Sequence, residues 1–413
     1  MDVFSLRRSS MAATTLIALL SLAACAASSA PDAVSTPASD GHGVEAGAAA
    51  EVASPALALV IGDAAGVVTL LDLETEDRAE ISAARPDIEK IDSDGRLVYI
   101  AHRSGERTTV DVVDTARWTA PHGDHTHSFL GGPRLLGTLE GAGDATVTAG
   151  EQRATIRFDD GDLVVLAHDD LADDFAAGYA DDLADPALAG IRIAGPVVPF
   201  ADHLLAAMAD AAIEVVDATG APDPALATPC TAASDADVTR VGVVFTCAEG
   251  AVLFTREVGG ALAVERIPYP AGAAGSTALS GRSDRPDLAG VAGDRGAWLL
   301  DVRERQWTLL PSDVPLVRAV AIGDDDGRTV ALDADGRVRV LSSDGTVLAR
   351  TEPLLAASLA DAALRDRVQL IVDAQHAYVS DPAAGAVHEI DHADAVVART
   401  FADLDPRFLG QVG

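Results

Sequence analysis

Three of the ten histidines in this sequence fall within six consecutive positions, and an aspartate lies among them. These residues are His122, Asp124, His125 and His127. Imidazole nitrogens are preferred ligands of zinc, and a carboxylate either completes such a shell or orients a histidine. His125 and His127 are two positions apart, so in an extended segment they point to the same face, with Cα atoms about 7 Å apart. Metal–nitrogen bonds of about 2 Å let both rings reach one ion from there.

The residues around this histidine cluster favour a turn. Pro121 stiffens the approach, and Gly123 permits a positive φ that folds His122 back toward the same centre. A single histidine in such a loop is more often an idle, solvated side chain, but three at this spacing predict a metal site. Zinc is the expected ion, although nickel and copper suit the same ligands.

The N-terminal residues have the pattern of an export signal. Arg7 and Arg8 form a basic region, residues 12–22 form an apolar region, and Leu22-Ala23-Ala24-Cys25 resembles the lipobox of bacterial lipoproteins. This pattern predicts a signal peptide over residues 1–24, lipidation of Cys25 and retention at the outer face of the cytoplasmic membrane. The alternatives are an ordinary signal peptide with an incidental cysteine and a short membrane anchor. The apolar region is short for a hydrocarbon core of about 30 Å.

Residues 25–53 are expected to form a disordered tether after the signal. They are rich in Ala, Ser, Pro and Gly and hold few large apolar side chains, so they cannot bury enough surface to fold. His42 lies on this tether, where a lone exposed histidine is more often idle than a metal contact.

Two cysteines remain after Cys25, namely Cys230 and Cys247. An exported chain with one remaining pair of cysteines usually joins them, so we expect a disulfide. A zinc site on these thiols would need further Cys or His nearby, and the sequence around them has none.

The formal charge of −34, from 64 acidic and 30 basic residues, restricts the partners of this chain. Such a surface repels nucleic acids and anionic lipid headgroups and attracts cations and basic partners. We therefore expect no nucleic-acid binding.

Short apolar runs separated by Asp-Gly, Gly-Asp and Asp-Ala turn signals recur from residue 54 to the end. Several share one pattern, an apolar strand that ends in aspartate: residues 67–72, 110–114, 213–217, 298–301 and 387–391. The runs return at intervals of about 40–50 residues, which is typical of β-propeller blades. We predict an all-β fold over residues 54–413, a β-propeller of eight blades with seven as the fallback, with a helical insertion near residues 170–185. A multi-sheet sandwich is the alternative, but it would not need this periodicity.

Motifs of nucleophilic, nucleotide-dependent or dithiol catalysis are missing from the sequence after Cys25. It contains no G-x-S-x-G elbow, P-loop, dinucleotide fingerprint or C-x-x-C pair. We therefore expect that the protein is not an enzyme.

Two stretches of sequence carry a family resemblance. His-Gly-Asp-His-Thr-His at 122–127 and the C-terminal stretch over residues 377–391, within an exported propeller, resemble the AztD-type zinc metallochaperones. The resemblance covers most of residues 55–413. It implies zinc binding by His122, Asp124, His125 and His127, and direct zinc transfer to the solute-binding protein of a zinc ABC importer. His102 matches the family pattern in Ala101-His102-Arg103, which implies a further ligand beside the cluster.

The sequence departs from that family at two places and leaves alternatives open. Family members carry His-Gly pairs where this chain reads Ile193-Ala194-Gly195-Pro196 and Thr231-Ala232-Ala233-Ser234-Asp235. The alternatives to a chaperone are a metal-independent interaction propeller on a lipid anchor, and a zinc buffer or sensor without transfer. In each case we expect a monomer.

Overall fold

The computed structural model describes residues 49–120, the backbone of Pro121 and His122, and residues 125–150, 153–168, 171, 175, 193–217 and 219–413. The predicted signal peptide, Cys25 and His42 lie outside this range, as does most of the expected helical insertion. Residues 49–52 belong to the expected disordered tether, but the structure shows that they form a strand, β1 (Ala49–Val52). Backbone pairing with a distant strand orders this short segment, which has little apolar surface of its own.

Antiparallel strands dominate the described residues and pair into nine sheets. Six sheets have four strands, which pair in the following orders: β33 (Pro406–Val412), β2 (Ala58–Asp63), β3 (Val68–Asp72) and β4 (Arg78–Ser82); β10 (Arg134–Ala142), β7 (Arg107–Asp114), β6 (Leu97–Ser104) and β5 (Ile88–Ser93); β14 (Ile193–Phe200), β15 (His203–Met208), β16 (Ala212–Asp217) and β17 (Thr228–Pro229); β18 (Asp235–Val238), β19 (Val243–Cys247), β20 (Gly250–Arg256) and β21 (Leu262–Pro268); β25 (Leu316–Ala321), β26 (Thr329–Asp333), β27 (Val338–Leu341) and β28 (Val347–Arg350); β29 (Leu370–Val372), β30 (His376–Asp381), β31 (Ala386–Asp391) and β32 (Val396–Phe401).

The other three sheets have three strands each within the described residues: β11 (Ala145–Ala149), β12 (Arg153–Phe158) and β13 (Leu163–Ala167); β22 (Asp287–Val291), β23 (Gly296–Asp301) and β24 (Gln306–Pro311); and β1, β9 (His125–Gly131) and β8 (Arg117–His122). The described helices are short: η2 (Gly293–Arg295), α2 (Ala356–Ala360) and α3 (Ala362–Arg365). None combines the length and the apolar character that a membrane crossing requires.

Aspartates at the ends of apolar strands account for the repeated sequence pattern. Each accepts a hydrogen bond at Oδ1 from a backbone N–H two or three residues further on, which closes the turn that follows the strand. The five aspartates of the pattern behave alike: Asp72, Asp114, Asp217, Asp301 and Asp391. The periodic residue is therefore a turn former rather than a site residue.

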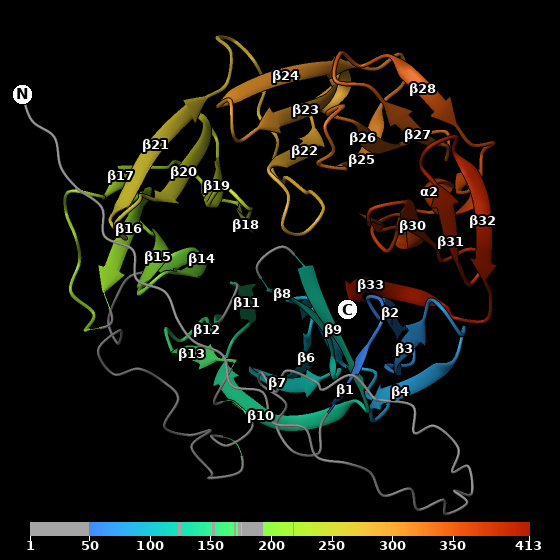
Figure 1. Ribbon diagram of the computed structural model, residues 1–413, viewed down its shortest axis with the longest axis horizontal. Coiled ribbons are helices and arrows are strands. Elements are labelled where there is room, and N and C mark those ends of the chain that lie inside the picture. Colours follow the sequence, from blue (N-terminus) through green and yellow to red (C-terminus); the bar gives the residue numbers. More distant parts are fainter. Residues whose placement is uncertain are drawn as a thin grey trace, which may run out of the picture. The chain divides into compact units, whose positions relative to one another are not determined.

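Eight of the sheets follow one another around a ring within residues 49–413 (Figure 1). The first strands of neighbouring sheets contact each other, as between β5 and β11, β11 and β14, and β25 and β29. The C-terminal β33 pairs with β2, with Val412 opposite Ala58, so the last strand completes the first sheet. This arrangement confirms the predicted all-β propeller; the number of blades stays a prediction.

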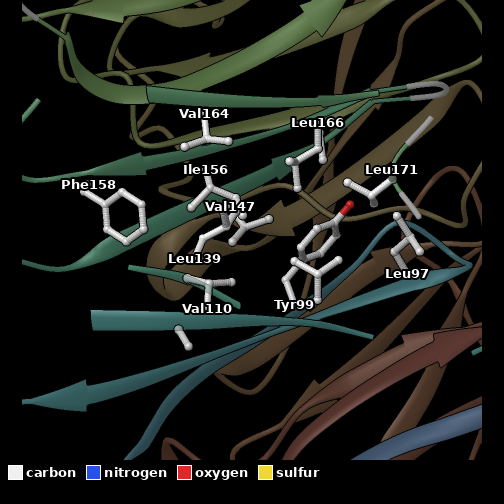
Figure 2. Close-up of a cluster of buried hydrophobic side chains, with 13 residues drawn as sticks. Leu97, Tyr99, Val110, Leu139, Val147, Ile156, Phe158, Val164, Leu166 and Leu171 are labelled. Atoms are coloured by element: carbon white, nitrogen blue, oxygen red, sulfur yellow. The ribbon is translucent and has the colours of Figure 1, made fainter. Parts of the chain in front are cut away.

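The core between the sheets consists mainly of Val, Leu, Ile and Ala, in a chain with only 4% aromatic residues. Figure 2 shows one such cluster, in which Tyr99 of β6 lies among aliphatic side chains from the neighbouring sheet, including Ile156 and Leu166. The Tyr99 hydroxyl donates a hydrogen bond to Asp94 Oδ2 over 2.9 Å, so its burial leaves no unsatisfied donor. Each fully buried aliphatic side chain stabilises the fold by about 2 kcal/mol.

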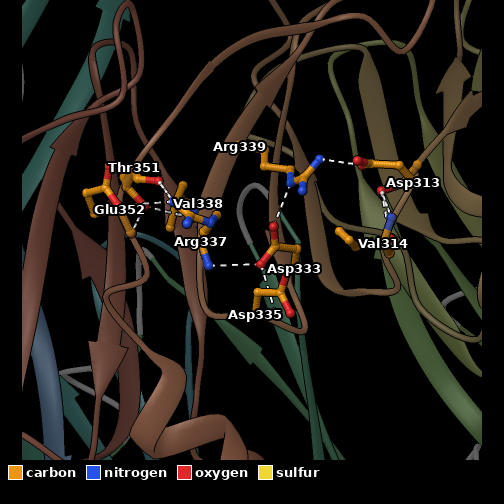
Figure 3. Close-up of polar contacts among 10 residues, drawn as sticks. Asp313, Val314, Asp333, Asp335, Arg337, Val338, Arg339, Thr351 and Glu352 are labelled. Atoms are coloured by element: carbon orange, nitrogen blue, oxygen red, sulfur yellow. Dashed lines mark hydrogen bonds and ion pairs between the residues drawn. The ribbon is translucent and has the colours of Figure 1, made fainter.

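A buried ion pair fixes the turn between β26 and β27. Arg339 Nε donates to Asp333 Oδ2 over 2.6 Å, and Arg339 Nη1 donates to Asp313 Oδ1 over 2.7 Å (Figure 3). Asp333 Oδ1 accepts from the backbone N–H groups of Asp335 and Arg337, which follows the aspartate pattern of the other turns. Asp333 is completely buried, so its charge depends on these donors.

The raised pKa of the Asp287 carboxyl predicts that the stability of the fold varies with pH. Burial, reinforced by the charge of Asp301 opposite it, raises the pKa of Asp287 from 3.8 to about 6. The folded state therefore holds this proton more tightly than the unfolded state does. The stabilisation that this bound proton provides is fully present below about pH 4 and is lost as the pH rises through about 6.

We therefore expect Asp287→Asn to raise the free energy of unfolding by about 2 kcal/mol at pH 7.5, because it removes an ionised buried carboxylate. At about pH 4 the gain should vanish. Urea unfolding at the two pH values measures it, with the exposed Asp210→Asn as the control. An equal gain at both pH values would show that burial of this charge is not the cause.

Candidate metal centre

The predicted histidine cluster lies on a hairpin formed by β8 and β9. The register places His122 opposite His125 and Ala120 opposite His127, so residues 123 and 124 connect the two strands. His125 and His127 are two residues apart on one strand, and their side chains therefore share a face, as the sequence predicts.

Side-chain contacts anchor the base of this hairpin to the propeller. Trp118 and Phe129 are cross-strand partners whose rings stack with centroids 4.8 Å apart. The guanidinium of Arg96 lies over Trp118, 4.0 Å from the ring centroid, which adds a cation–π contact. Arg117 is buried and pairs with Asp72 of β3 over 2.8 Å. The hairpin therefore projects from a fixed base.

The imidazoles of His125 and His127 converge near the end of the hairpin. Their Nε2 atoms are 3.0 Å apart, and the ring planes meet at 64° with centroids 4.8 Å apart. An ion bound at about 2.0–2.1 Å from both nitrogens would subtend an N–metal–N angle of roughly 95°, close to the tetrahedral range. His125 is exposed and His127 is partly exposed, so the pair is open to a partner molecule.

Glu51 of β1 supplies a carboxylate to this pair. Strand β1 pairs with β9 along the hairpin, and Glu51 Oε1 lies 2.6 Å from His127 Nδ1. A proton on Nδ1, donated to Glu51, leaves the lone pair on Nε2 for a metal ion, as in carboxylate–histidine–zinc sites. Sequence reasoning missed Glu51, because it lies 76 residues before His127 in a segment with no site-like pattern.

The other residues of the predicted cluster are only partly described. The backbone of His122 belongs to β8, and its side chain lies outside the described residues, as does Asp124. Within the described ranges, no three His, Cys, Asp or Glu side chains are gathered in an arrangement that holds a metal. Of the predicted cluster, the described side chains are thus those of His125 and His127, and Glu51 is an additional partner that was not predicted.

His102 has different surroundings from the hairpin histidines. It is completely buried on β6, with Nε2 3.2 Å from Asp111 Oδ2 and Nδ1 3.5 Å from Asp87 Oδ1. Burial opposes the ionisation of Asp111, but His102 and the hydroxyl of Thr138 outweigh it and hold the pKa of Asp111 below its ordinary value. The ring of His102 lies between the carboxylate of Asp111 on β7 and that of Asp87, which directly precedes β5, and its expected role beside the cluster stays a prediction.

Three other histidines have partners that account for them without a metal. His168 Nε2 lies 3.2 Å from Asp94 Oδ2, and His376 Nε2 lies 3.4 Å from Glu389 Oε1. His388 lies between Thr400 and Asp381, at 3.0 Å from the hydroxyl and 3.4 Å from the carboxylate.

The disulfide between Cys230 and Cys247 is confirmed, with Cα atoms 5.2 Å apart. Cys230 directly follows β17, and Cys247 ends β19 of the next sheet. The bond therefore joins two neighbouring sheets of the propeller.

AztD from Citrobacter koseri has a similar structure, with a TM-score of 0.69 and 17% sequence identity over 87% of this chain and 98% of that chain. The structure of apo AztD from the same organism gives the same values. The chain has an AztD-like fold.

The dihydro-heme d1 dehydrogenase NirN in complex with DHE is also similar, with a TM-score of 0.51 and 17% identity over 86% of this chain and 74% of that chain. No protein-family model and no curated protein matches the sequence. At these identities the likeness to AztD and to NirN concerns the fold alone, and the chemistry of the site rests on the residues of this chain.

Proposed function

We propose that this protein is an extracytoplasmic zinc metallochaperone that binds zinc on the β8–β9 hairpin and delivers it to the solute-binding protein of an ABC importer. The observation that carries the proposal is the 3.0 Å separation of the His125 and His127 Nε2 atoms on an exposed hairpin. The AztD-like fold and the His-Gly-Asp-His-Thr-His sequence support it.

The proposed zinc ligands are His122, His125 and His127, with Asp124 completing the shell and Glu51 orienting His127. This donor set contains neutral imidazole and carboxylate groups and no thiolate. His102 is left out, because its contacts are with Asp87 and Asp111.

Such a site suits transfer better than storage. Closed four-cysteine shells hold structural zinc, whereas histidine and carboxylate ligands on an exposed hairpin can be exchanged one at a time for those of an acceptor. A lipid on Cys25 is the proposed anchor at the membrane surface, which fractionation of a Cys25→Ala variant tests. The excess of acidic residues favours an acceptor with a basic docking surface.

The decisive experiment measures transfer kinetics. Zinc-loaded protein is mixed with the apo form of the cognate solute-binding protein, or with a chelator of matched affinity. We expect the solute-binding protein to take zinc faster than the chelator does, with a rate that grows with acceptor concentration.

Transfer at the spontaneous dissociation rate for both acceptors would identify a zinc buffer or sensor instead. Binding of the partner that is indifferent to zinc and to loss of the histidines would identify an interaction propeller. Either result would overturn the chaperone assignment.

A further inference from the structure

A second polar site lies where the first strands of the sheets meet. These strands enclose a cavity of about 650 Å³, lined by residues of β5, β11, β14, β18, β25, β29 and β33. The cavity thus combines residues from segments far apart in the sequence, and hydroxyl and carboxylate groups are prominent among its lining side chains.

Two carboxylates of β18 dominate one wall of this cavity. Asp235 and Asp237 are two residues apart on the strand, so both side chains lie on the same face. The Oδ2 atom of Asp237 is buried, and none of the described residues donates a hydrogen bond to it. Burial, with the charge of Asp235 next to it, raises the pKa of Asp237 well above its ordinary value, and burial also raises the pKa of Asp235.

A buried carboxylate oxygen without a donor is costly unless a cation or a proton accompanies it. The only lysine of the chain, Lys90, also lines the cavity, but its ammonium lies 2.9 Å from Asp92 Oδ1. Five aspartates line the cavity, namely Asp92, Asp94, Asp235, Asp237 and Asp284, and Lys90 is the only cationic residue among the described lining residues. The cavity therefore has an excess of negative charge that its own residues do not neutralise.

The donor chemistry of the cavity selects the type of cation. Among the described lining residues there is no His, Cys or Met, so zinc and copper find none of the nitrogen or sulfur ligands they prefer. Carboxylates and hydroxyl groups, such as those of Thr146 and Thr148, are ligands of hard cations. The volume also leaves room for the water molecules that calcium and magnesium retain, at about 30 Å³ each.

We infer that this cavity binds a hard divalent cation, calcium or magnesium, through Asp235 and Asp237. The site is chemically distinct from the hairpin histidines and does not depend on the proposed zinc function. Ionisation of both carboxylates accompanies binding, so the ion displaces protons from the pair.

Calorimetric titration of the full chain with calcium chloride and, separately, magnesium chloride tests this inference. We expect saturable binding of one ion per chain for at least one of the two salts, and the comparison decides between them. The isosteric Asp235→Asn, Asp237→Asn variant should bind at least about tenfold more weakly, because it loses both charged ligands. The matched control is Asp202→Asn, Asp210→Asn, which removes two exposed carboxylates and should bind like the unmodified chain.

Two further measurements keep the test decisive. The His125→Ala, His127→Ala variant should bind calcium or magnesium unchanged, whatever happens to its zinc binding. Titration of the unmodified chain in two buffers of different ionisation enthalpy should reveal proton release, which requires no variant to fold. Absence of saturable binding by either ion, undiminished affinity in the Asp235 and Asp237 variant, or loss of binding in the histidine variant would each overturn the inference.

Discussion

Replacing both His125 and His127 with alanine is expected to lower the zinc affinity of this protein by more than about a hundredfold, because a four-ligand shell then loses two nitrogen donors. The two Nε2 atoms lie 3.0 Å apart, and no described third histidine lies near enough to take their place. Competition with a chromophoric zinc chelator measures the affinity. The same titration of a His203→Ala, His376→Ala variant is the control for the loss of two histidines outside the hairpin, and it should leave the affinity unchanged.

Two further measurements of zinc affinity distinguish the loss of zinc ligands from a general disturbance of the hairpin. Zinc affinity of the unmodified protein should fall as the pH is lowered, since protons compete with zinc for the imidazole nitrogens. Glu51→Gln should weaken binding by about 10–100-fold, because it keeps the shape but loses the charge that orients His127. Unchanged zinc affinity in the His125 and His127 variant would show that the hairpin is not the site.

The periodic features of the sequence predicted the fold well, because their causes are local. An aspartate at the end of an apolar strand closes its own turn within two or three residues, as Asp72 and Asp391 do. The spacing of such turns is set by the length of four paired strands, so the repeat of about 40–50 residues indicated the propeller. The convergence of His125 and His127 was predictable for the same reason, since alternate residues of one strand share a face.

Contacts between distant segments were not predictable from local pattern. Glu51 reaches His127 only because β1 pairs with β9, and nothing in Ala49–Val52 indicates that partner. His102 is only 23 residues before His125, but it lies on β6, whereas the hairpin leaves the sheet after β7. The cavity brings Lys90 near Asp235 only because the sheets form a ring. Each of these placements depends on tertiary pairing.

Arg339→Ala is expected to lower the free energy of unfolding by about 3–5 kcal/mol, the usual effect of removing one partner of a buried ion pair. Asp333 is completely buried and accepts its side-chain hydrogen bond from Arg339 Nε, so the variant leaves an uncompensated charge within the sheet of β25–β28. The hydrogen bond of Arg339 Nη1 to Asp313 is lost as well.

Arg337→Ala is the matched control for this effect. Arg337 lies two residues away on the same turn, and its ion pair is with Glu352, which is 90% exposed (Figure 3). Solvent screens that pair, and the variant also loses the hydrogen bond that Arg337 Nη1 donates to the Thr351 carbonyl oxygen, so stability should fall by no more than about 2 kcal/mol. Urea unfolding of the two variants, followed by circular dichroism, measures the difference. Equal losses of unfolding free energy for Arg337→Ala and Arg339→Ala would mean that the buried Asp333 charge is not the cause and that either truncation disturbs the turn. A loss confined to Arg339→Ala, reduced when Asp333→Asn is added, would assign the effect to the unpaired charge.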